Sequence, residues 1–433
     1  MLGNEMWYAS LPVEWSVKKI KYVASLYTGN SIKDSEKDNY TDKKDARPYI
    51  ATKHIDAVSN NINYNNGLYV KHNDTSFKIA KCGSTLMCIE GGSAGKKKGF
   101  LVQDVSFVNK LCCFEPKSGI NSKYLFYYFM SPNYEEDFNM RITGLIGGVS
   151  ISELSNMLII VPPLSEQQAI ADYLDEKCSK IDEIIAESKA SIDEYKELKQ
   201  SVIFEAVTKG LDKTAEVKDS GYDFIGCIPD KWEMCKVRHL GTAQNGISIG
   251  GDAFGSGYPF VSYGDVYKNY SLPKTVDKLV QSSEEDRKRY SVEKGDWFFT
   301  RTSETIDEVG FSCVCEETIP DAVFAGFLIR VRPFNNRIYT GFAKYYFRSK
   351  HLRAFFVKEM NLVTRASLSQ GLLKDTPVVV PPYDEQIEIA NYLEDRCATI
   401  DGIIKDKESL IQDLEAYKKS LIYEVVTGKR RVV

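Results

Sequence analysis

The amino-acid sequence predicts an α+β protein in which two mixed α/β domains are separated by an antiparallel coiled coil of two long α-helices. Two segments, 161–208 and 380–427, align with each other without a gap at an offset of 219 residues. Apolar or small residues recur along both segments at alternating steps of four and three, which is the spacing of a coiled-coil seam. Shorter motifs in the flanking regions also repeat in the same order. The chain is therefore predicted to consist of two related halves with a pseudo-two-fold axis.

The first long helix is expected to span residues 165–208. Pro162-Pro163 cannot lie inside a helix, because proline lacks the amide hydrogen. Ser165 can cap the helix, and Gln168 can complete a capping box. No Gly or Pro follows before Gly210. Lys199 occupies one seam position, and the other seam residues are Leu174, Cys178, Ile181, Ile185, Ser188, Ile192, Tyr195 and Val202.

The second long helix repeats this pattern after residue 380. Asp384 takes the capping position of Ser165, and Lys418 takes the seam position of Lys199. The other seam residues are Leu393, Cys397, Ile400, Ile404, Lys407, Ile411, Leu414 and Leu421. Because each helix is polar outside one stripe, each is expected to pack that stripe against the other helix.

The repeat extends into the two globular regions. Leu11-Pro12-x-x-Trp15 returns as Ile228-Pro229-x-x-Trp232, and Pro48-Tyr49-Ile50 returns as Pro259-Phe260-Val261. Each region mixes β-like runs with at least one helical stretch, which is typical of an α+β domain. The predicted division is a first domain over 1–160, a first helix over 161–212, a linker over 213–227, a second domain over 228–379 and a second helix over 380–433.

The distribution of charge is compatible with a DNA-facing surface on the globular domains. The whole chain carries a formal charge of −4. Residues 161–212 carry −6 and residues 380–433 carry −3, which leaves +5 for the remainder. The acidity therefore lies on the helices, and the globular parts are mildly basic.

Composition also predicts the compartment. No run of about 18 apolar residues occurs, and the first residues lack the basic and apolar regions of a signal peptide. The ten cysteines include no C-x-x-C pair, and the chain has four histidines. We expect a cytoplasmic protein with reduced, mostly buried thiols and no zinc site.

The sequence motifs that resemble catalytic motifs lack residues that catalysis needs. Residues 90–99 resemble a phosphate-binding loop, but Glu90 stands where the first glycine belongs and Lys97 where Ser or Thr should hold magnesium. Val380-Pro381-Pro382-Tyr383 lacks the polar first residue of the methyltransferase motif that it resembles. None of the four histidines has a counterpart in the other half. The sequence offers no case for a nucleophile–histidine set.

Basic and hydroxyl residues in the domain loops are candidates for DNA contact. Glycines and lysines in 91–99 suit backbone amides and ammonium groups that meet phosphates, and Arg301 can bond guanine through two hydrogen bonds. The plainer alternatives are a solvated basic turn, an ordinary ion-paired surface turn, or a loop that joins domain to helix. The candidates are Lys53, Lys96, Lys97, Lys98, Arg141, Thr143, Arg301, Thr302, Ser303 and Arg365.

The two helix starts resemble those of a known family. The first reads Pro162-Pro163-Leu164-Ser165-Glu166-Gln167-x-x-Ile170-Ala171-x-Tyr173-Leu174-Asp175. The second reads Pro381-Pro382-Tyr383-Asp384-Glu385-Gln386-x-x-Ile389-Ala390-x-Tyr392-Leu393-Glu394. Together with the Pro-x-x-Trp openings and Lys294-Gly295-Asp296, they are similar to the specificity subunits of type I restriction–modification enzymes. The likeness covers nearly the whole chain.

This resemblance implies a non-catalytic subunit with two target recognition domains, each of which reads half of a split double-stranded DNA site. It implies that the helix pair spaces the half-sites and docks two methyltransferase subunits, with restriction subunits outside. It implies no cofactor on this chain, with S-adenosylmethionine, ATP and magnesium on the partners. The implied partner-binding residues are Glu166, Gln167, Ile170, Tyr173, Glu385, Gln386, Ile389 and Tyr392.

Two departures and two alternatives remain open. Gly83-Ser84 stands where the second half has Gly295-Asp296, and the Gly-Lys-rich loop stands where the second half has 300–303. These departures put the DNA contacts of the first domain in doubt. One alternative is a single-chain DNA methyltransferase or nuclease, which would bind S-adenosylmethionine or cleave DNA alone. The other is a coiled-coil adaptor that does not contact DNA.

Overall fold

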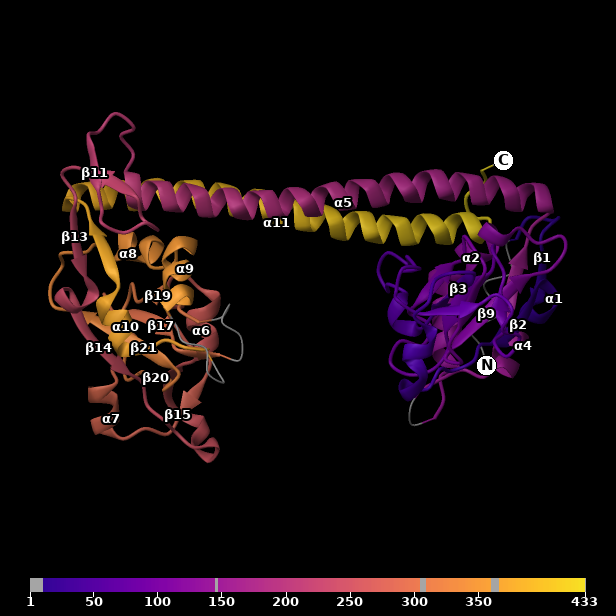
Figure 1. Ribbon diagram of the computed structural model, residues 1–433, viewed down its shortest axis with the longest axis horizontal. Coiled ribbons are helices and arrows are strands. Elements are labelled where there is room, and N and C mark those ends of the chain that lie inside the picture. The colour runs from indigo at the N-terminus through magenta and orange to yellow at the C-terminus, as the bar shows by residue number, and fades with distance from the viewer. Residues whose placement is uncertain (1–10, 145–146, 304–308, 360–365, 433) are drawn as a thin grey trace. The chain divides into compact units, whose positions relative to one another are not determined.

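The computed structural model describes residues 11–144, 147–303, 309–359 and 366–432 (Figure 1). The chain forms two compact units. The first comprises Met1–Lys189 with Lys407–Val433, and the second comprises Ala190–Asp406. The long helices α5 (Leu164–Lys209) and α11 (Tyr383–Val426) each contribute to both units. Each unit therefore combines one globular domain with a part of both helices.

The domain of the first unit contains two four-stranded sheets and a separate strand pair. The first sheet has the order β2-β9-β6-β7, the second has the order β4-β3-β8-β5, and β1 pairs with β10. The strands are β1 (Ser16–Lys19), β2 (Ala24–Thr28), β3 (Ala46–Ile50), β4 (Tyr69–Lys71), β5 (Ile79–Ala80), β6 (Thr85–Cys88), β7 (Lys98–Phe100), β8 (Val105–Phe107), β9 (Leu111–Pro116) and β10 (Leu158–Val161). The helices are α1 (Ile20–Val23), η1 (Asp34–Tyr40), η2 (Thr52–His54), α2 (Ser122–Phe129), α3 (Pro132–Met140) and α4 (Ile151–Asn156).

The domain of the second unit repeats this plan. Its sheets have the orders β14-β21-β17-β19 and β16-β15-β20, β13 pairs with β23, β18 with β22, and β11 with β12. The strands are β11 (Val217–Asp219), β12 (Cys227–Pro229), β13 (Glu233–Lys236), β14 (Gly241–Asn245), β15 (Phe254–Val261), β16 (Leu279–Val280), β17 (Trp297–Thr300), β18 (Thr302–Ser303), β19 (Ser312–Val314), β20 (Val323–Phe324), β21 (Leu328–Pro333), β22 (Ala366–Ser367) and β23 (Pro377–Val380). The helices are η3 (Val237–His239), η4 (Gly251–Ala253), α6 (Tyr263–Lys268), α7 (Glu284–Arg289), α8 (Thr340–Tyr346), α9 (Lys350–Glu359) and α10 (Gln370–Asp375).

The predicted α+β repeat is confirmed at the level of single strands. Each main sheet places its first strand beside its last strand in the chain, and the two remaining strands follow in order. The Pro-x-[Ile/Val] runs take equivalent places. Tyr49 pairs in parallel with Ser106, and Phe260 pairs in parallel with Val323. The apolar frame is thus conserved between the halves, although their loops differ.

The predicted antiparallel pairing of the long helices is confirmed within each unit. In the first unit, Lys418 on α11 lies 2.7 Å from Asp182 on α5. In the second unit, Lys199 on α5 lies 2.6 Å from Asp401 on α11. Both lysines occupy seam positions, and both aspartates stand 219 residues apart. The two ion pairs are therefore reciprocal, as in an interface between two copies of one surface.

Seam side chains are buried along much of both helices. Leu174, Cys178, Ile181 and Ile192 on α5 are buried, as is Leu393 on α11. Gly210 follows α5 with φ of +73°, a conformation that glycine adopts without strain. The helix ends there, as the sequence predicted.

The capping predictions at the starts of both long helices were wrong. Helix α5 already begins at Leu164 and α11 at Tyr383, so Ser165 and Asp384 lie inside the helices. Gln168 does not complete a capping box; its side-chain oxygen accepts from Asn121 and its side-chain nitrogen donates to Asp172. The predicted linker 213–227 is partly structured, since its residues 217–219 form β11 and pair with β12.

All ten cysteines are free, and seven are buried. In the described part of the chain, no helix combines the length and the apolar character needed to cross a membrane.

Candidate nucleic-acid interface

In the first domain, the loop formed by residues 90–97 connects β6 to β7 and lies between two other loops. On one side, the Lys97 ammonium donates a hydrogen bond to the Thr52 carbonyl at 3.1 Å. On the other side, Glu90 and Thr143 each form a β-bridge with Gly148. The structure thus brings Lys53, Lys96, Lys97 and Thr143 to neighbouring loops at one edge of the domain.

The basic residues of this loop cluster affect the histidine beside them. Lys53 and Lys96 are exposed, and Lys97 is half-buried. Burial, together with the positive charges of Lys53 and Lys97, lowers the pKa of His54. The His54 Nδ1 atom accepts a hydrogen bond from the Ala51 amide, so the neutral ring holds the loop that carries Lys53. The cluster therefore places ammonium groups around a histidine ring whose own protonation is disfavoured.

Lys98 does not belong to this exposed cluster, and its prediction as a DNA contact was wrong. Its side chain is 1% exposed and lies 2.7 Å from the Glu135 carboxylate on α3. Burial lowers the pKa of Lys98, and the ion pair with Glu135 opposes that effect. The side chains of consecutive strand residues point to opposite faces, so Lys98 points inward where β7 begins.

Arg141 is also directed toward its own domain. Its guanidinium lies 3.1 Å from Asp137 on α3 and 3.1 Å from Glu153 on α4. Two carboxylates thus neutralise the charge that was predicted to meet phosphate. Arg141 instead ties α3 to α4, whereas the neighbouring Thr143 is exposed.

In the second domain, the segment after β17 takes the place of the Gly-Lys loop. The Arg301 amide donates to the Phe327 carbonyl at 2.9 Å, and the Arg301 carbonyl accepts from the Leu368 amide at 2.7 Å. Thr302 pairs with Ser367, and Ser303 pairs with Ala366. In the main sheet of each domain, β6 and β17 occupy the same place. In both domains, the segment that follows this strand pairs with the segment that precedes α4 or α10. Arg365 lies outside the described residues.

Three residues near Arg301 escaped the sequence analysis. Phe327 is 62% exposed although it stands beside a buried strand, and the Gln370 amide donates to the Asn245 side-chain oxygen at 3.0 Å. Amide side chains suit adenine edges, and an exposed ring suits a thymine methyl group. The apolar run that contains Phe327 gave no signal of its exposure.

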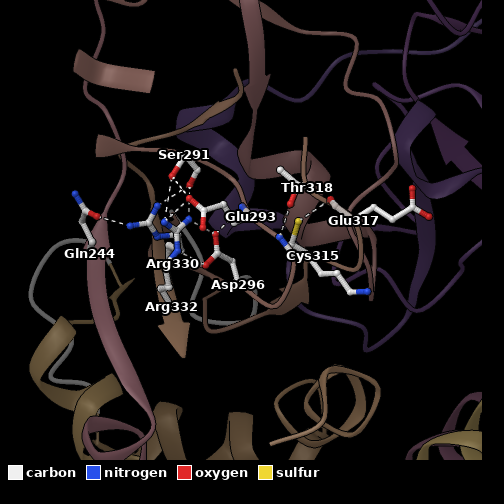
Figure 2. Close-up of polar contacts among 10 residues, drawn as sticks. Gln244, Ser291, Glu293, Asp296, Cys315, Glu317, Thr318, Arg330 and Arg332 are labelled. Carbon is white, nitrogen blue, oxygen red and sulfur yellow. Dashed lines mark hydrogen bonds and ion pairs between the residues drawn. The ribbon is translucent and has the colours of Figure 1, made fainter. Parts of the chain in front are cut away.

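The Lys-Gly-Asp motif of the second domain serves the fold. The Arg332 guanidinium donates hydrogen bonds to both oxygens of the buried Asp296 carboxylate, at 2.7 and 2.6 Å (Figure 2). Ser84 takes the place of Asp296 in the first domain, and Glu115 takes the place of Arg332 on the equivalent strand. The acid and the arginine are therefore replaced together. The difference between Gly83-Ser84 in the first half and Gly295-Asp296 in the second therefore concerns an ion pair inside the domain.

Comparison with known proteins identifies the family. The family described as "Type I restriction modification DNA specificity domain" matches twice, over residues 12–194 and 229–412. The chain belongs to this family. It is a specificity subunit of a type I restriction–modification system, with two target recognition domains.

Relatives of this specificity subunit match along most of their length. The type I restriction enzyme EcoBI specificity subunit of Escherichia coli is 22% identical, and the match covers 97% of this chain and 87% of that protein. The EcoKI specificity subunit of Escherichia coli strain K12 is also 22% identical, with 97% and 90% covered. The StySPI specificity subunit of Salmonella potsdam is 23% identical, with 97% and 90% covered.

Two solved structures share the fold. A chain from "Structural basis underlying complex assembly and conformational transition of the type I R-M system" has a TM-score of 0.75 at 14% identity, with 97% of this chain and all of that chain covered. The crystal structure of the HsdS subunit from Thermoanaerobacter tengcongensis has a TM-score of 0.55 at 15% identity, with 99% of this chain and all of that chain covered.

The Glu-Gln pair at each helix start of the specificity subunit binds its own domain. The Trp15 indole donates to the Glu166 carboxylate at 3.0 Å, and the Trp232 indole donates to the Glu385 carboxylate at 2.9 Å. A Cβ atom on Gly210 would lie 3.0 Å from the Trp232 ring. The start of α11, the Trp232 ring and the end of α5 therefore meet at one point.

The glutamines complete this attachment. Gln386 is fully buried; its amide donates to the Pro381 and Arg337 carbonyls, and its oxygen accepts from the Tyr339 amide. Gln167 makes the equivalent bonds in the first unit, where its oxygen accepts from the Asn121 amide at 2.8 Å. Each glutamine thus satisfies buried backbone groups of its own domain, whose unpaired burial would be costly.

Six of the eight predicted partner-binding residues therefore make contacts within their own unit, and their binding of a partner subunit stays a prediction. Glu166 and Glu385 bond tryptophans of their own units. The other four, which are Gln167, Ile170, Gln386 and Ile389, are buried. Tyr173 and Tyr392 retain exposed surface and can still meet a partner.

Proposed function

We propose that this specificity subunit recognises a bipartite site in double-stranded DNA and docks two methyltransferase (modification) subunits together with restriction subunits. In this proposal the chain is non-catalytic and cytoplasmic. S-adenosylmethionine, ATP and magnesium are bound by the partner subunits. The doubled family match and the specificity-subunit relatives support the proposal.

The main observation behind the two-reader proposal is a shared frame with different side chains. The two target recognition domains have the same order of strands in the main sheet. At the same junction, however, the first presents the lysine loop of residues 90–97 and the second presents Arg301 and Thr302. Because base edges differ in their donors and acceptors, two readers with different side chains select different half-sites.

The proposed DNA contacts are side chains that keep exposed surface, together with two residues taken from the sequence alone. In the first domain they are Lys53, Lys96, Lys97 and Thr143. In the second domain they are Arg301 and Thr302, with Phe327, Asn245 and Gln370 added from the structure, and Ser303 and Arg365 kept from the sequence. Lysines supply affinity through phosphates, whereas the arginine and amide side chains supply base selection.

Exposed apolar residues on the helices supply the proposed docking surface for modification subunits. In the first unit, Ile184 on α5 and Leu410 and Tyr417 on α11 are 44–50% exposed. In the second unit, Leu198 on α5 is 48% exposed. These positions flank the seam, so the helix pair keeps its own packing while it offers apolar area to another helix.

Salt dependence of DNA binding tests the assigned contacts. With modification subunits bound, the triple variant Lys53→Gln, Lys96→Gln, Lys97→Gln is expected to bind DNA more weakly. The slope of log affinity against log salt concentration should fall by up to about 2.7, or about 0.9 for each lost phosphate contact. Fluorescence anisotropy with a labelled duplex that contains the recognition site measures both quantities.

Lys98→Met is the matched control, because Lys98 adjoins the same loop but is buried. Its affinity and salt slope should stay close to those of the wild-type subunit. A triple variant with an unchanged slope, or a Lys98→Met variant with an equal loss, would contradict the assigned contacts.

A further inference from the structure

A hollow of about 410 Å³ lies in the first unit, between the target recognition domain and the helix pair. Its lining includes the ion pair of Lys418 with Asp182, together with Met130 from the domain and Ile422 from α11. Asn61, on the loop after η2, lies at its rim. A second ion pair, Lys123 with Asp175, also lines it, so two ion pairs and apolar side chains surround one space.

In the second unit, an aromatic side chain of the chain itself occupies the equivalent place. Lys199, the counterpart of Lys418, lies 5.0 Å from the centre of the Tyr270 ring and pairs with Asp401. Tyr345, the counterpart of Tyr127, lies 5.8 Å from the same ring. The reciprocal ion pair is therefore covered by a tyrosine in one unit only.

Backbone contacts show that the segment of Tyr270 in the second unit and the loop of residues 60–62 in the first unit occupy equivalent positions. The Tyr270 carbonyl accepts from the amide of Val314, the last residue of β19. In the first unit, the loop of residues 60–62 lies against Gly99 in β7, the strand equivalent to β19. The loop there carries two asparagines, Asn60 and Asn61, whose short side chains line the hollow without filling it.

A second difference keeps the hollow open. In the second unit, the Arg348 guanidinium donates to the Tyr267 and Asn269 carbonyls, which fixes the segment that carries Tyr270. Met130 takes the place of Arg348 in the first unit and cannot donate those bonds. The first unit therefore lacks the equivalents of both Arg348 and Tyr270, and the space beside Lys418 can hold a group from another molecule.

We propose that this hollow receives a tyrosine side chain presented by a modification subunit. The assignment rests on the proposed function, because the hollow opens beside the helix pair on which that partner is proposed to dock. The ring would pack on Met130 and Ile422 with Lys418 beside its face, as Lys199 lies beside Tyr270. Its hydroxyl group would donate to a carboxylate, as Tyr127 donates to Asp175 at 2.6 Å.

The tyrosine side-chain analogue p-cresol tests the hollow on the full chain. We expect p-cresol to shift the methyl NMR signal of Met130, and Asn61→Trp, which fills the hollow from its rim, to abolish that shift. Val58→Trp is the control, because Val58 lies on the same loop but is 68% exposed and outside the hollow. An unshifted Met130 signal in the wild-type chain would overturn the proposal without the need for any variant.

Affinity for the purified modification subunit tests the occupant. Asn61→Trp is expected to weaken that affinity at least tenfold, whereas Val58→Trp should change it less than twofold. Equal affinity of both variants and the wild type would overturn the inference and leave the proposed function intact. A wild-type chain that binds no modification subunit would overturn the proposed function, and the assigned occupant with it.

Discussion

Replacement of Trp232 by alanine is expected to lower the free energy of unfolding of the second unit by about 3–5 kcal/mol, the usual cost of removing a large buried aromatic side chain. Trp232 is fully buried in the main core of that unit. It also bonds Glu385 at the start of α11 and contacts Gly210 at the end of α5. One substitution therefore loosens both helices from the domain.

Trp232→Phe separates the two contributions of the indole. It keeps most of the apolar area and removes the N–H bond to a carboxylate, which is worth about 1.5–3 kcal/mol. Urea unfolding followed by circular dichroism, with hydrogen exchange to locate the weakened segments, measures each variant. The account of the helix attachment would be wrong if Trp232→Ala cost less than about 1 kcal/mol, well below the range expected for such a site.

Exchange of residues 11–160 for those of another specificity subunit is expected to change one half of the recognised DNA site and to leave the other half unaltered. The proposed contacts of the second half, such as Arg301, stay in place in this chimera. Binding to the original half-site pair should fall by several orders of magnitude, because each mismatched base pair costs about 1–3 kcal/mol. Methylation mapping of DNA modified by the chimera with its modification subunits reads both half-sites.

Replacement of residues 228–379 is the control for this exchange. It should alter the opposite half-site. The assignment of one reader to each domain would be contradicted by a chimera that altered both half-sites or neither. The Trp15 and Glu166 pair must be kept intact in the design, because that bond joins the exchanged domain to α5.

The fold was predictable because its strongest signals are periodic and doubled. The seam spacing predicted the helix that spans Leu164–Lys209, and the reciprocal ion pairs of Lys199 and Lys418 follow from the same 219-residue offset. The hairpin of β11 and β12 was missed because β11 is exposed and polar, with no alternating apolar face. Strand periodicity is visible only where one face is buried.

The candidate site was less predictable, because the same residue type can face solvent or the core. Lys96 and Lys98 stand two residues apart, yet one is exposed and the other is paired with Glu135. The Glu-Gln pairs gave a family signal but no sign of which partner they bind. Only the coordinates show that the glutamates bond Trp15 and Trp232 and that the glutamines bond backbone groups of their own domains. The repeated motif therefore marked these residues as functional, but it did not show whether they attach the helix to its own domain or bind a partner subunit.

The sequence of the methylated site tests the central claim most directly. DNA from a host that produces this specificity subunit with its modification subunits would be sequenced by a method that detects methylated bases. The account predicts one motif made of two short, dissimilar half-sites with an unspecified spacer between them. A single continuous motif, a spacerless palindrome or the absence of methylation would contradict it.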